Sequence, residues 1–354
     1  MDETPQKVKE AQKGRPIKFR KMNGTGPEEQ AMSEGALNKP SSTALTVLNG
    51  LSGMASIGGN LLVLLTIYKQ PRLHTISNYF IASLAVADFI VGLVINPIWA
   101  TRSAMNIWED KEPLTIASEC LAAHTVVATS LNLCAVSIDR YLAVVKVFRY
   151  DTSLSERRCR IIICSIWLAA CLALLPRALI QDRLDLQKFW IVGCTITFFI
   201  PLCVIAYCYV HIFKVARSQA KKIQVVSVSS ETGRKAAMNS IKERKIALTI
   251  AIIIGLFITL WSPSFVLSSI QTFFADDCLK IKLKQRWFWT ALVAFSNSAV
   301  NPWVYALRGE EYRSTFRKLL RRGDKNLHLS FYNEKTETRQ TKKITNRLCT
   351  GKLT

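Results

Sequence analysis

The sequence is poor in negative charge. It has 25 Asp and Glu residues against 47 Lys and Arg residues, so the 354-residue chain carries a formal net charge of +22. Such an excess first suggests a nucleic-acid-binding protein, because clustered basic side chains neutralise phosphates. That interpretation requires basic residues on water-soluble folded surfaces, and this sequence places them almost wholly between long apolar runs. We therefore expect no nucleic-acid partner.

Motifs for covalent chemistry are also missing. The sequence contains no metal-ligand spacing, no glycine-rich phosphate loop and no pattern typical of a catalytic triad. Most of the ten cysteines fall inside apolar runs, where Cys packs as a small hydrophobic residue, and they do not resemble a disulfide framework. Intrinsic disorder is excluded, since 49% of the residues are apolar. These absences indicate a folded protein that is not an enzyme.

Long apolar runs are what the sequence has in abundance. A transmembrane helix needs about 20 mainly apolar residues to cross about 30 Å of hydrocarbon. Runs such as Ile246–Leu260 lack the polar face that a soluble helical bundle requires. Seven runs are long enough, at about 44–67, 76–101, 114–145, 159–179, 189–213, 246–274 and 287–307. We predict an all-α fold, a seven-transmembrane helix bundle.

The distribution of charge predicts how the bundle is oriented. Loops after the first, third and fifth runs, together with the C-terminal tail, hold +20 of the net +22, and cytoplasmic loops are the ones enriched in Lys and Arg. We therefore predict a multi-pass plasma-membrane protein with an extracellular N-terminus. Its predicted parts are an extracellular tail at 1–43, the membrane domain at 44–307, an amphipathic membrane-surface helix at 308–322 and a cytoplasmic tail at 323–354.

One segment departs from this charge pattern. Residues 7–21 hold seven Lys or Arg, which is unusual for a translocated tail, and a translation start at Met22 is the alternative. Asn23 begins an Asn-Gly-Thr glycosylation sequon, which fits an extracellular location.

Polar and aromatic motifs occur in a fixed order, at least one in each run. They are Gly59-Asn60, Leu84-Ala85-Val86-Ala87-Asp88, Ser137-Ile138-Asp139-Arg140-Tyr141, Trp167, Pro201 with Tyr209, Phe257 with Trp261 and Pro263, and Asn301-Pro302-Trp303-Val304-Tyr305. With these motifs the chain resembles the rhodopsin-like (class A) G-protein-coupled receptors over about residues 44–320. The resemblance implies an extracellular ligand and a heterotrimeric G protein as partners, with arrestin and a receptor kinase as further candidates.

Asp139 and Arg140 need partners in the low dielectric at the end of their helix. The resemblance implies that Arg140 bridges Asp139 and Glu243 at rest, and that agonist frees Arg140 for the G protein. The alternative is that these charges only anchor helix ends. The resemblance assigns the coupling role to Asp139, Arg140, Tyr141, Glu243, Tyr209, Asn301, Pro302 and Tyr305.

Asp88 is a carboxylate near the bilayer midplane, so it requires a counter-ion, a proton or hydrogen-bond donors. The polar residues around Asp88 resemble a sodium pocket that, in the family, favours the inactive state. The alternative is a hydrated polar network without an ion. We expect no other cofactor. The sodium-site candidates are Asp88, Thr129, Asn297, Ser298 and Asn301.

The resemblance also places a ligand cavity between the helices, with Trp261 at its floor; simple packing of this tryptophan is the alternative. The expected lining is Glu119, Ala122, Ala123, Val126, Gly193, Thr197, Trp261, Ser264, Phe265, Ser268, Trp287, Ala291 and Phe295. Basic residues near the rim and in the third outer loop could attract an anionic lipid or acidic peptide. The alternative is that they merely face headgroups and water. They are Arg102, Arg177, Lys280, Lys282, Lys284 and Arg286.

Three departures from the family pattern bear on the ligand. Thr115 stands where most members carry the cysteine of the extracellular disulfide, so we expect no such bond, with Cys120–Cys278 as the alternative pairing. Amine receptors carry Asp where this chain has Ala122, and opsins carry Lys where it has Phe295. A typical amine and retinal are therefore disfavoured, and a lipid or peptide is favoured.

The missing disulfide and the short second outer loop resemble the melanocortin, lysophospholipid and cannabinoid branch of the family, although Pro201 and Asn301 differ from the melanocortin pattern. Two alternative functions stay open. One is a constitutive or dimer-partner receptor without a ligand of its own, and the other is a seven-helix transporter, which would favour broken helices and internal repeats.

Overall fold

The computed structural model describes residues 37–107, 112–146, 154–179, 189, 192–193, 195–226, 231–274 and 277–320. Within these ranges every regular element is helical. The elements are α2 (Lys39–Lys69), η1 (Pro71–Leu73), α3 (Ile76–Ile90), η2 (Val91–Ile95), α4 (Asn96–Met105), α5 (Pro113–Val145), α7 (Glu156–Leu172), α8 (Leu175–Leu179), η4 (Thr195–Phe199), α10 (Ile200–Val226), α11 (Glu231–Phe273) and α12 (Asp277–Arg308). After Gly309 a further helix covers residues 310–320.

Local sequence explains where several helices begin. The side chains of Asn38, Thr75 and Ser155 accept hydrogen bonds from backbone N–H groups at the starts of α2, α3 and α7. Such caps satisfy donors that a helix cannot satisfy internally. α5 begins at Pro113, a residue suited to a first helical turn because its missing N–H has no partner there in any helix.

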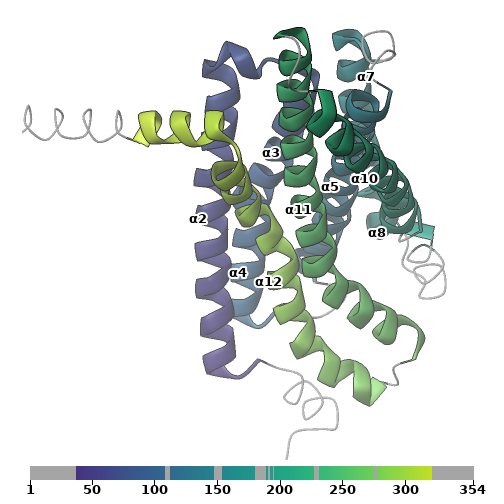
Figure 1. The fold of residues 1–354 in the computed structure, drawn as a ribbon. Helices are drawn as coiled ribbons and strands as arrows, with labels where there is room; N and C mark the ends of the chain where they lie inside the picture. Colours follow the sequence, from purple (N-terminus) through teal and green to yellow (C-terminus); the bar gives the residue numbers. More distant parts are fainter. Residues whose placement is uncertain are drawn as a thin grey trace, which may run out of the picture.

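The helices form one bundle with α5 near its centre (Figure 1). α5 packs against α3, α7, α10 and α11, while α12 packs against α2 and α11. α2 also contacts α3 and α4. A single large core cluster joins side chains from most of these helices, among them Leu45, Phe80, Leu133, Ile253 and Phe295. The predicted all-α bundle is therefore confirmed.

α3, η2 and α4 make one continuous helical stretch whose middle turn is wider than an α-helix. The π-helical turn at Val91–Ile95 ends two residues before Pro97, whose ring cannot accommodate normal helical hydrogen bonding four residues back. The stretch ends at Asn106, a non-glycine residue with a left-handed φ of 57°. Its side chain pairs with the backbone N–H and C=O of Leu37, at 3.0 and 3.1 Å.

Several helices extend beyond the ends that apolar runs predict. Residues 214–245, expected to be a loop, are helical up to Val226 and again from Glu231. Residues 276–286 were also expected to be a loop, but α12 begins at Asp277. The apolar runs indicate only the part that crosses hydrocarbon, whereas Ala-, Lys-, Glu- and Gln-rich sequence continues a helix in water. α11, with 43 residues, is about 65 Å long, twice the hydrocarbon thickness.

By length and composition, five helical stretches in the described part of the chain could cross a membrane: Lys39–Lys69, Ile76–Met105, Pro113–Val145, Thr195–Ser218 and Arg244–Phe273. The fourth predicted run is divided by a turn between α7, of 17 residues, and α8. The seventh, α12, is less apolar because Ser296, Asn297, Ser298 and Asn301 lie in its middle.

A close crossing of α2 and α12 depends on Gly59. A Cβ atom added to Gly59 would lie 2.8 Å from Cγ and 2.9 Å from Cβ of Pro302, whereas one added to neighbouring Gly58 would have no neighbour within 4 Å. Because tightly packed interiors have little room to move, the missing side chain at Gly59 allows α12 to approach.

We predict that Gly59→Ala destabilises the protein and Gly58→Ala does not. Overpacking of this kind costs about 1–3 kcal/mol. The measurement is thermal unfolding of the detergent-solubilised full-length chain, with Gly58→Ala as the matched control. Equal melting temperatures for the two variants would contradict this crossing.

Candidate functional site

A buried ionic cluster lies near the C-terminal end of α5. Asp139 Oδ2 accepts hydrogen bonds from Arg140 Nε at 2.9 Å and Arg140 Nη2 at 2.7 Å, and the side chains are 0% and 4% exposed. Ser77 of α3 donates to the same oxygen at 2.5 Å and accepts from Arg140 Nη2. The cluster therefore ties α5 to α3, and Ser77 has a place in it that sequence motifs did not indicate.

Tyr209 connects α10 to α11 near the same end of the bundle. Its hydroxyl donates to the backbone oxygen of Ala247 at 3.2 Å, and its side chain is buried. The ring of Tyr141 lies 5.8 Å from that of Tyr207 and 6.0 Å from that of His211. The side chain of Glu243, expected to pair with Arg140, lies outside the described residues.

Asn301, Pro302 and Tyr305 follow one another along α12. Asn301 faces Asp88, Pro302 packs at Gly59, and the ring of Tyr305 stacks on Tyr312 with centroids 5.6 Å apart and planes at 26°. The Tyr305 hydroxyl is buried and has no hydrogen-bond partner among the described residues. A buried hydroxyl without a hydrogen-bond partner lowers the stability of the folded state. The side chain of Tyr305 would therefore gain a hydrogen bond by moving to a more polar position.

Asp88 lies at the centre of a second polar cluster and is 0% exposed. Asn301 Nδ2 donates to Asp88 Oδ2 at 2.7 Å. Ser56 Oγ donates to the Asp88 backbone oxygen at 2.7 Å, and Asn60 Nδ2 donates to Ser298 O at 2.9 Å. α2, α3 and α12 therefore meet at this cluster.

The donor set of this cluster fits a hard cation such as sodium. Four buried side-chain oxygens lack a hydrogen-bond partner within the described ranges, namely Asp88 Oδ1, Asn60 Oδ1, Asn297 Oδ1 and Asn301 Oδ1. Hard cations prefer carboxylate and amide oxygens. The remaining candidate, Thr129 of α5, is also buried. No group of three or more His, Cys, Asp or Glu side chains that could hold a metal ion occurs in the part of the chain that the structure describes.

Aromatic rings from four helical stretches meet in the opposite half of the bundle. Trp261 lies 5.6 Å from Phe295 and 6.1 Å from Phe265, measured between ring centroids. Phe295 in turn lies 5.7 Å from Trp99, and Phe265 lies 4.2 Å from Phe198. These contacts bring together cavity residues that are far apart in the sequence, and they add Trp99 and Phe198, which sequence reasoning missed.

Other expected cavity residues lie around this aromatic cluster. Trp287 Nε1 donates to Ser268 Oγ at 3.2 Å, and the Trp287 ring lies 4.9 Å from Trp99. Ala122, Val126 and Ala291 pack in the same core, and Ser264 is buried. Glu119 and Ala123 are half-buried on α5, and Thr197 Oγ1 donates to Gly193 O at 2.7 Å.

Arg102 differs from its predicted place at an open rim. It is 2% exposed, its guanidinium lies 4.7 Å from the ring centroid of Trp99, and Nη1 donates to Ser118 Oγ at 2.6 Å. Burial over aromatic faces is favourable for a guanidinium, which is weakly hydrated. Lys282 and Arg286 are exposed on α12. The side chains of Arg177, Lys280 and Lys284 are not among those that the structure describes.

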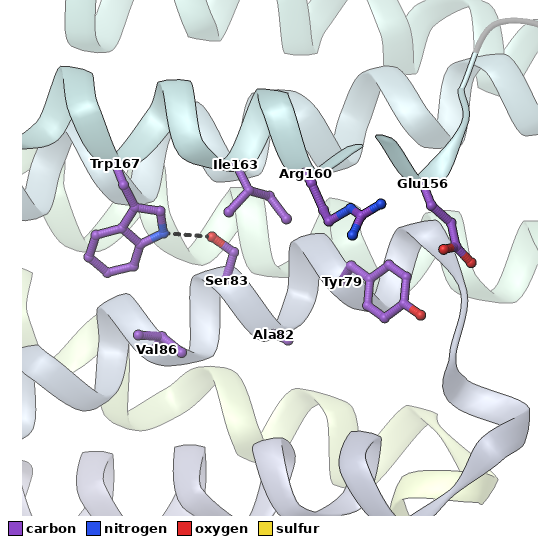
Figure 2. A pocket seen from close by; sticks show the side chains of 8 residues that line it. All are labelled: Tyr79, Ala82, Ser83, Val86, Glu156, Arg160, Ile163 and Trp167. Atoms are coloured by element: carbon purple, nitrogen blue, oxygen red, sulfur yellow. Dashed lines mark hydrogen bonds between the residues drawn. The ribbon is translucent and has the colours of Figure 1, made fainter. Parts of the chain in front are cut away.

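Figure 2 shows a groove between α3 and α7 that is separate from the aromatic cluster. Its volume is about 440 Å³. Trp167 Nε1 donates to Ser83 Oγ across it at 3.1 Å. The lining residues are Tyr79, Ala82, Ser83, Val86, Glu156, Arg160, Ile163 and Trp167. The Trp167 motif is therefore a contact between two helices.

Some predicted features lie outside the described residues. They are the Asn23 sequon with the rest of residues 1–36, the cytoplasmic tail at 323–354, and the side chain of Cys278. The predictions of glycosylation at Asn23 and of the absent disulfide stay predictions.

The helical bundle with these motifs belongs to a known class. Residues 59–305 match the family described as 7 transmembrane receptor (rhodopsin family), so the chain is a member of the rhodopsin-like G-protein-coupled receptors. The predicted resemblance is confirmed. The chain is a multi-pass membrane receptor and not an enzyme.

Several curated proteins are similar over most of their length. The human histamine H2 receptor is 29% identical over 303 residues, which cover 80% of this chain and 82% of the receptor. The dog histamine H2 receptor is 29% identical over 79% of each chain. The mouse trace amine-associated receptor 9 is 27% identical over 73% of this chain and 78% of its own.

We predict that Asp88 and Asn301 stabilise the bundle as a pair. Asn301→Ala removes a donor from a buried carboxyl group, which costs about 1–3 kcal/mol. In an Asp88→Ala background the same change should cost much less, because the carboxyl group is already absent. Thermal unfolding of the four chains of this cycle gives the coupling. Ser296→Ala, at an exposed hydroxyl that donates to Val293 O of its own helix, is the control; additive losses for Asp88 and Asn301 would refute the pairing.

Proposed function

We propose that this receptor converts binding of an extracellular ligand into activation of a heterotrimeric G protein. The single observation that supports this best is the buried Asp139–Arg140 cluster, with an Arg140 Nη2–Asp139 Oδ2 distance of 2.7 Å. A buried ion pair is weak evidence for added stability but is well suited to a switch. Breaking the Asp139–Arg140 pair would free the Arg140 guanidinium at the end of the bundle where we place the G protein.

The resting state would be held by contacts on both sides of Arg140. Ser77 and Asp139 bind the guanidinium from α3 and α5. We propose Glu243 of α11 as the third partner, which agonist releases when α11 moves outward. Tyr209 and Tyr305 would then support the freed Arg140, and Tyr141 would take part in G-protein contact. Arrestin and a receptor kinase are proposed as further partners, acting on the threonine-rich tail.

The ligand would act through the aromatic cluster. Trp261 contacts Phe265, Phe257 and Phe295. A displacement of the Trp261 ring would therefore shift neighbouring side chains on both α11 and α12. By their names, the relatives above are receptors for histamine and trace amines. This chain has Ala122 where we expect the ammonium-binding Asp of amine receptors. We therefore propose a ligand that is neither a typical amine nor retinal, and favour a lipid or peptide.

We further propose that the Asp88 cluster takes up a sodium ion that favours the resting state. The unpartnered oxygens of Asp88, Asn297 and Asn301 support this, because an ion or water would satisfy them. Binding sodium would draw α3 and α12 together through Asp88 and Asn301. We also propose a plasma-membrane location with the N-terminus outside, as the positive charge of the inner loops favours.

Coupling is tested with a panel of G-protein sensors in cells that express the full chain. Glu243→Ala should raise ligand-independent signalling, because the resting state loses one partner of Arg140. Arg140→Ala should abolish that signal, also in the Glu243→Ala background. Surface expression is measured for each variant. Ion current or solute flux without any sensor response would instead support a transporter.

Sodium binding is tested without knowing the ligand. Replacing choline by sodium at constant ionic strength should raise the melting temperature of the purified chain, since a ligand specific for the folded state stabilises it, by about 0.8 kcal/mol at three times its Kd. Asp88→Asn should remove the response, while Ser296→Ala, at an exposed hydroxyl outside the cluster, should keep it. An equal response in wild type and Asp88→Asn would rule out this site.

A further inference from the structure

The first turn of α3 contacts two parts of the proposed switch. Ser77 binds both members of the Asp139–Arg140 pair. The next residue, Asn78, accepts a hydrogen bond at Oδ1 from the hydroxyl of Tyr312, at 2.9 Å. Tyr312 belongs to the helix at 310–320, which follows α12 and projects sideways from the bundle beyond α2 (yellow in Figure 1). One turn of α3 therefore joins the ionic cluster to this last helix.

Tyr312 is packed against residues that precede and follow it. It is 7% exposed, stacks on Tyr305 and meets Phe316 edge to face with ring centroids 6.3 Å apart. The hydrogen bond to Asn78 fixes the outer end of the Tyr312 ring while Tyr305 covers its face. Any rotation of Tyr305 toward Arg140 must break this stack.

Gly309 makes the close packing of the two tyrosines possible. A Cβ atom on Gly309 would lie 3.0 Å from both Tyr305 O and Tyr312 Cδ2, closer than side chains normally approach. The Gly309 N–H donates to Tyr305 O at 2.8 Å and its carbonyl accepts from Arg313 N at 2.9 Å. The bend between α12 and the last helix is thus held by backbone hydrogen bonds, which place Tyr312 beside α3.

The protonation and orientation of both partners suit the bond. Burial raises the pKa of the Tyr312 phenol above its ordinary value, with the nearby Glu311 carboxylate adding to the effect. The hydroxyl is therefore protonated at neutral pH and can donate. Asn78 Nδ2 donates to Thr75 Oγ1 at 3.1 Å, so its amide oxygen is the atom that faces Tyr312.

We infer that the hydrogen bond from Tyr312 to Asn78 is a latch that positions Tyr305 and holds the receptor at rest. The inference rests on the proposed G-protein coupling and adds two positioning residues to it. A phenylalanine at position 312 would keep the stack on Tyr305 but lose the bond. The latch is thus a property of the tyrosine hydroxyl, and its breaking would release Tyr305 and loosen the turn of α3 that carries Ser77.

The decisive variant is Tyr312→Phe, which removes one oxygen atom and keeps the aromatic packing. We expect about a two- to fivefold rise in ligand-independent signalling per receptor at the cell surface, in line with the net value of one hydrogen bond. Asn78→Ala should raise signalling to a similar degree. The double variant should signal no more than the stronger single variant, because the bond is lost once.

A matched control breaks a different hydrogen bond of the same helix. Ser83→Ala removes the acceptor for Trp167 Nε1 on the α7 side of α3 (Figure 2) and should leave ligand-independent signalling unchanged. A merely structural role of Tyr312 would lower surface expression or melting temperature without raising the signal per receptor. Unchanged signalling in Tyr312→Phe, with Glu243→Ala raised in the same assay, would overturn the latch and leave the coupling intact.

A second measurement does not depend on G protein. Spin labels on the last helix and on the exposed end of α2 report their separation in the purified full-length chain. Tyr312→Phe and Asn78→Ala should broaden the distance distribution, and Ser83→Ala should not. If no variant couples to any sensor, the proposed function fails, and a distribution that Tyr312→Phe leaves unchanged would also refute the latch.

Discussion

The carboxyl group of Asp88 has to be satisfied inside a bundle that is surrounded by hydrocarbon, and much of the structure follows from this requirement. Asn301 supplies a donor from α12, and Ser56 and Asn60 tie α2 to the same cluster. An unpaired buried charge costs on the order of several kcal/mol. These helices can therefore move only if other polar contacts replace those around Asp88. The close crossing at Gly59 and Pro302 lies beside the cluster and brings α12 near enough for those contacts.

Two polar regions of the receptor are joined by α12. Asn301 is part of the Asp88 cluster, and four residues later Tyr305 stacks on Tyr312. Tyr312 reaches Asn78, whose neighbour Ser77 binds Asp139 and Arg140. Short-range contacts therefore connect Asp88 to the ionic cluster on α5. These contacts are continuous in space, which supports the proposed coupling between the sodium site at Asp88 and the G-protein site at Arg140.

Much of the site could be predicted from single residues because hydrocarbon makes polar groups costly. Asp88, Asp139 and Arg140 stand out in apolar runs, and each has the polar partners that such a residue requires. Ser77 and Trp99 could not be identified in this way. A serine or a tryptophan in an apolar helix is common, and its role depends on which helix face it occupies and what crosses there. Ser77 is 62 residues from Asp139, and Trp99 is 188 residues before Trp287, so only the packing brings them together. Arg102 was misplaced at the rim for the same reason, because its aromatic neighbours come from two helices.

The sequence by itself determined that the fold is all-helical and spans a membrane, since the length of an apolar run and the cost of charge in lipid are local properties. It also determined which polar residues needed partners. Helix ends beyond the apolar runs were decided by helix propensity and capping, which hydropathy does not report. The tertiary structure alone decided that Tyr312 would meet Asn78 and that Ser77 would meet Arg140. Those contacts require a crossing of helices, a bend at Gly309 and a specific rotation of each helix, and no local pattern encodes all three.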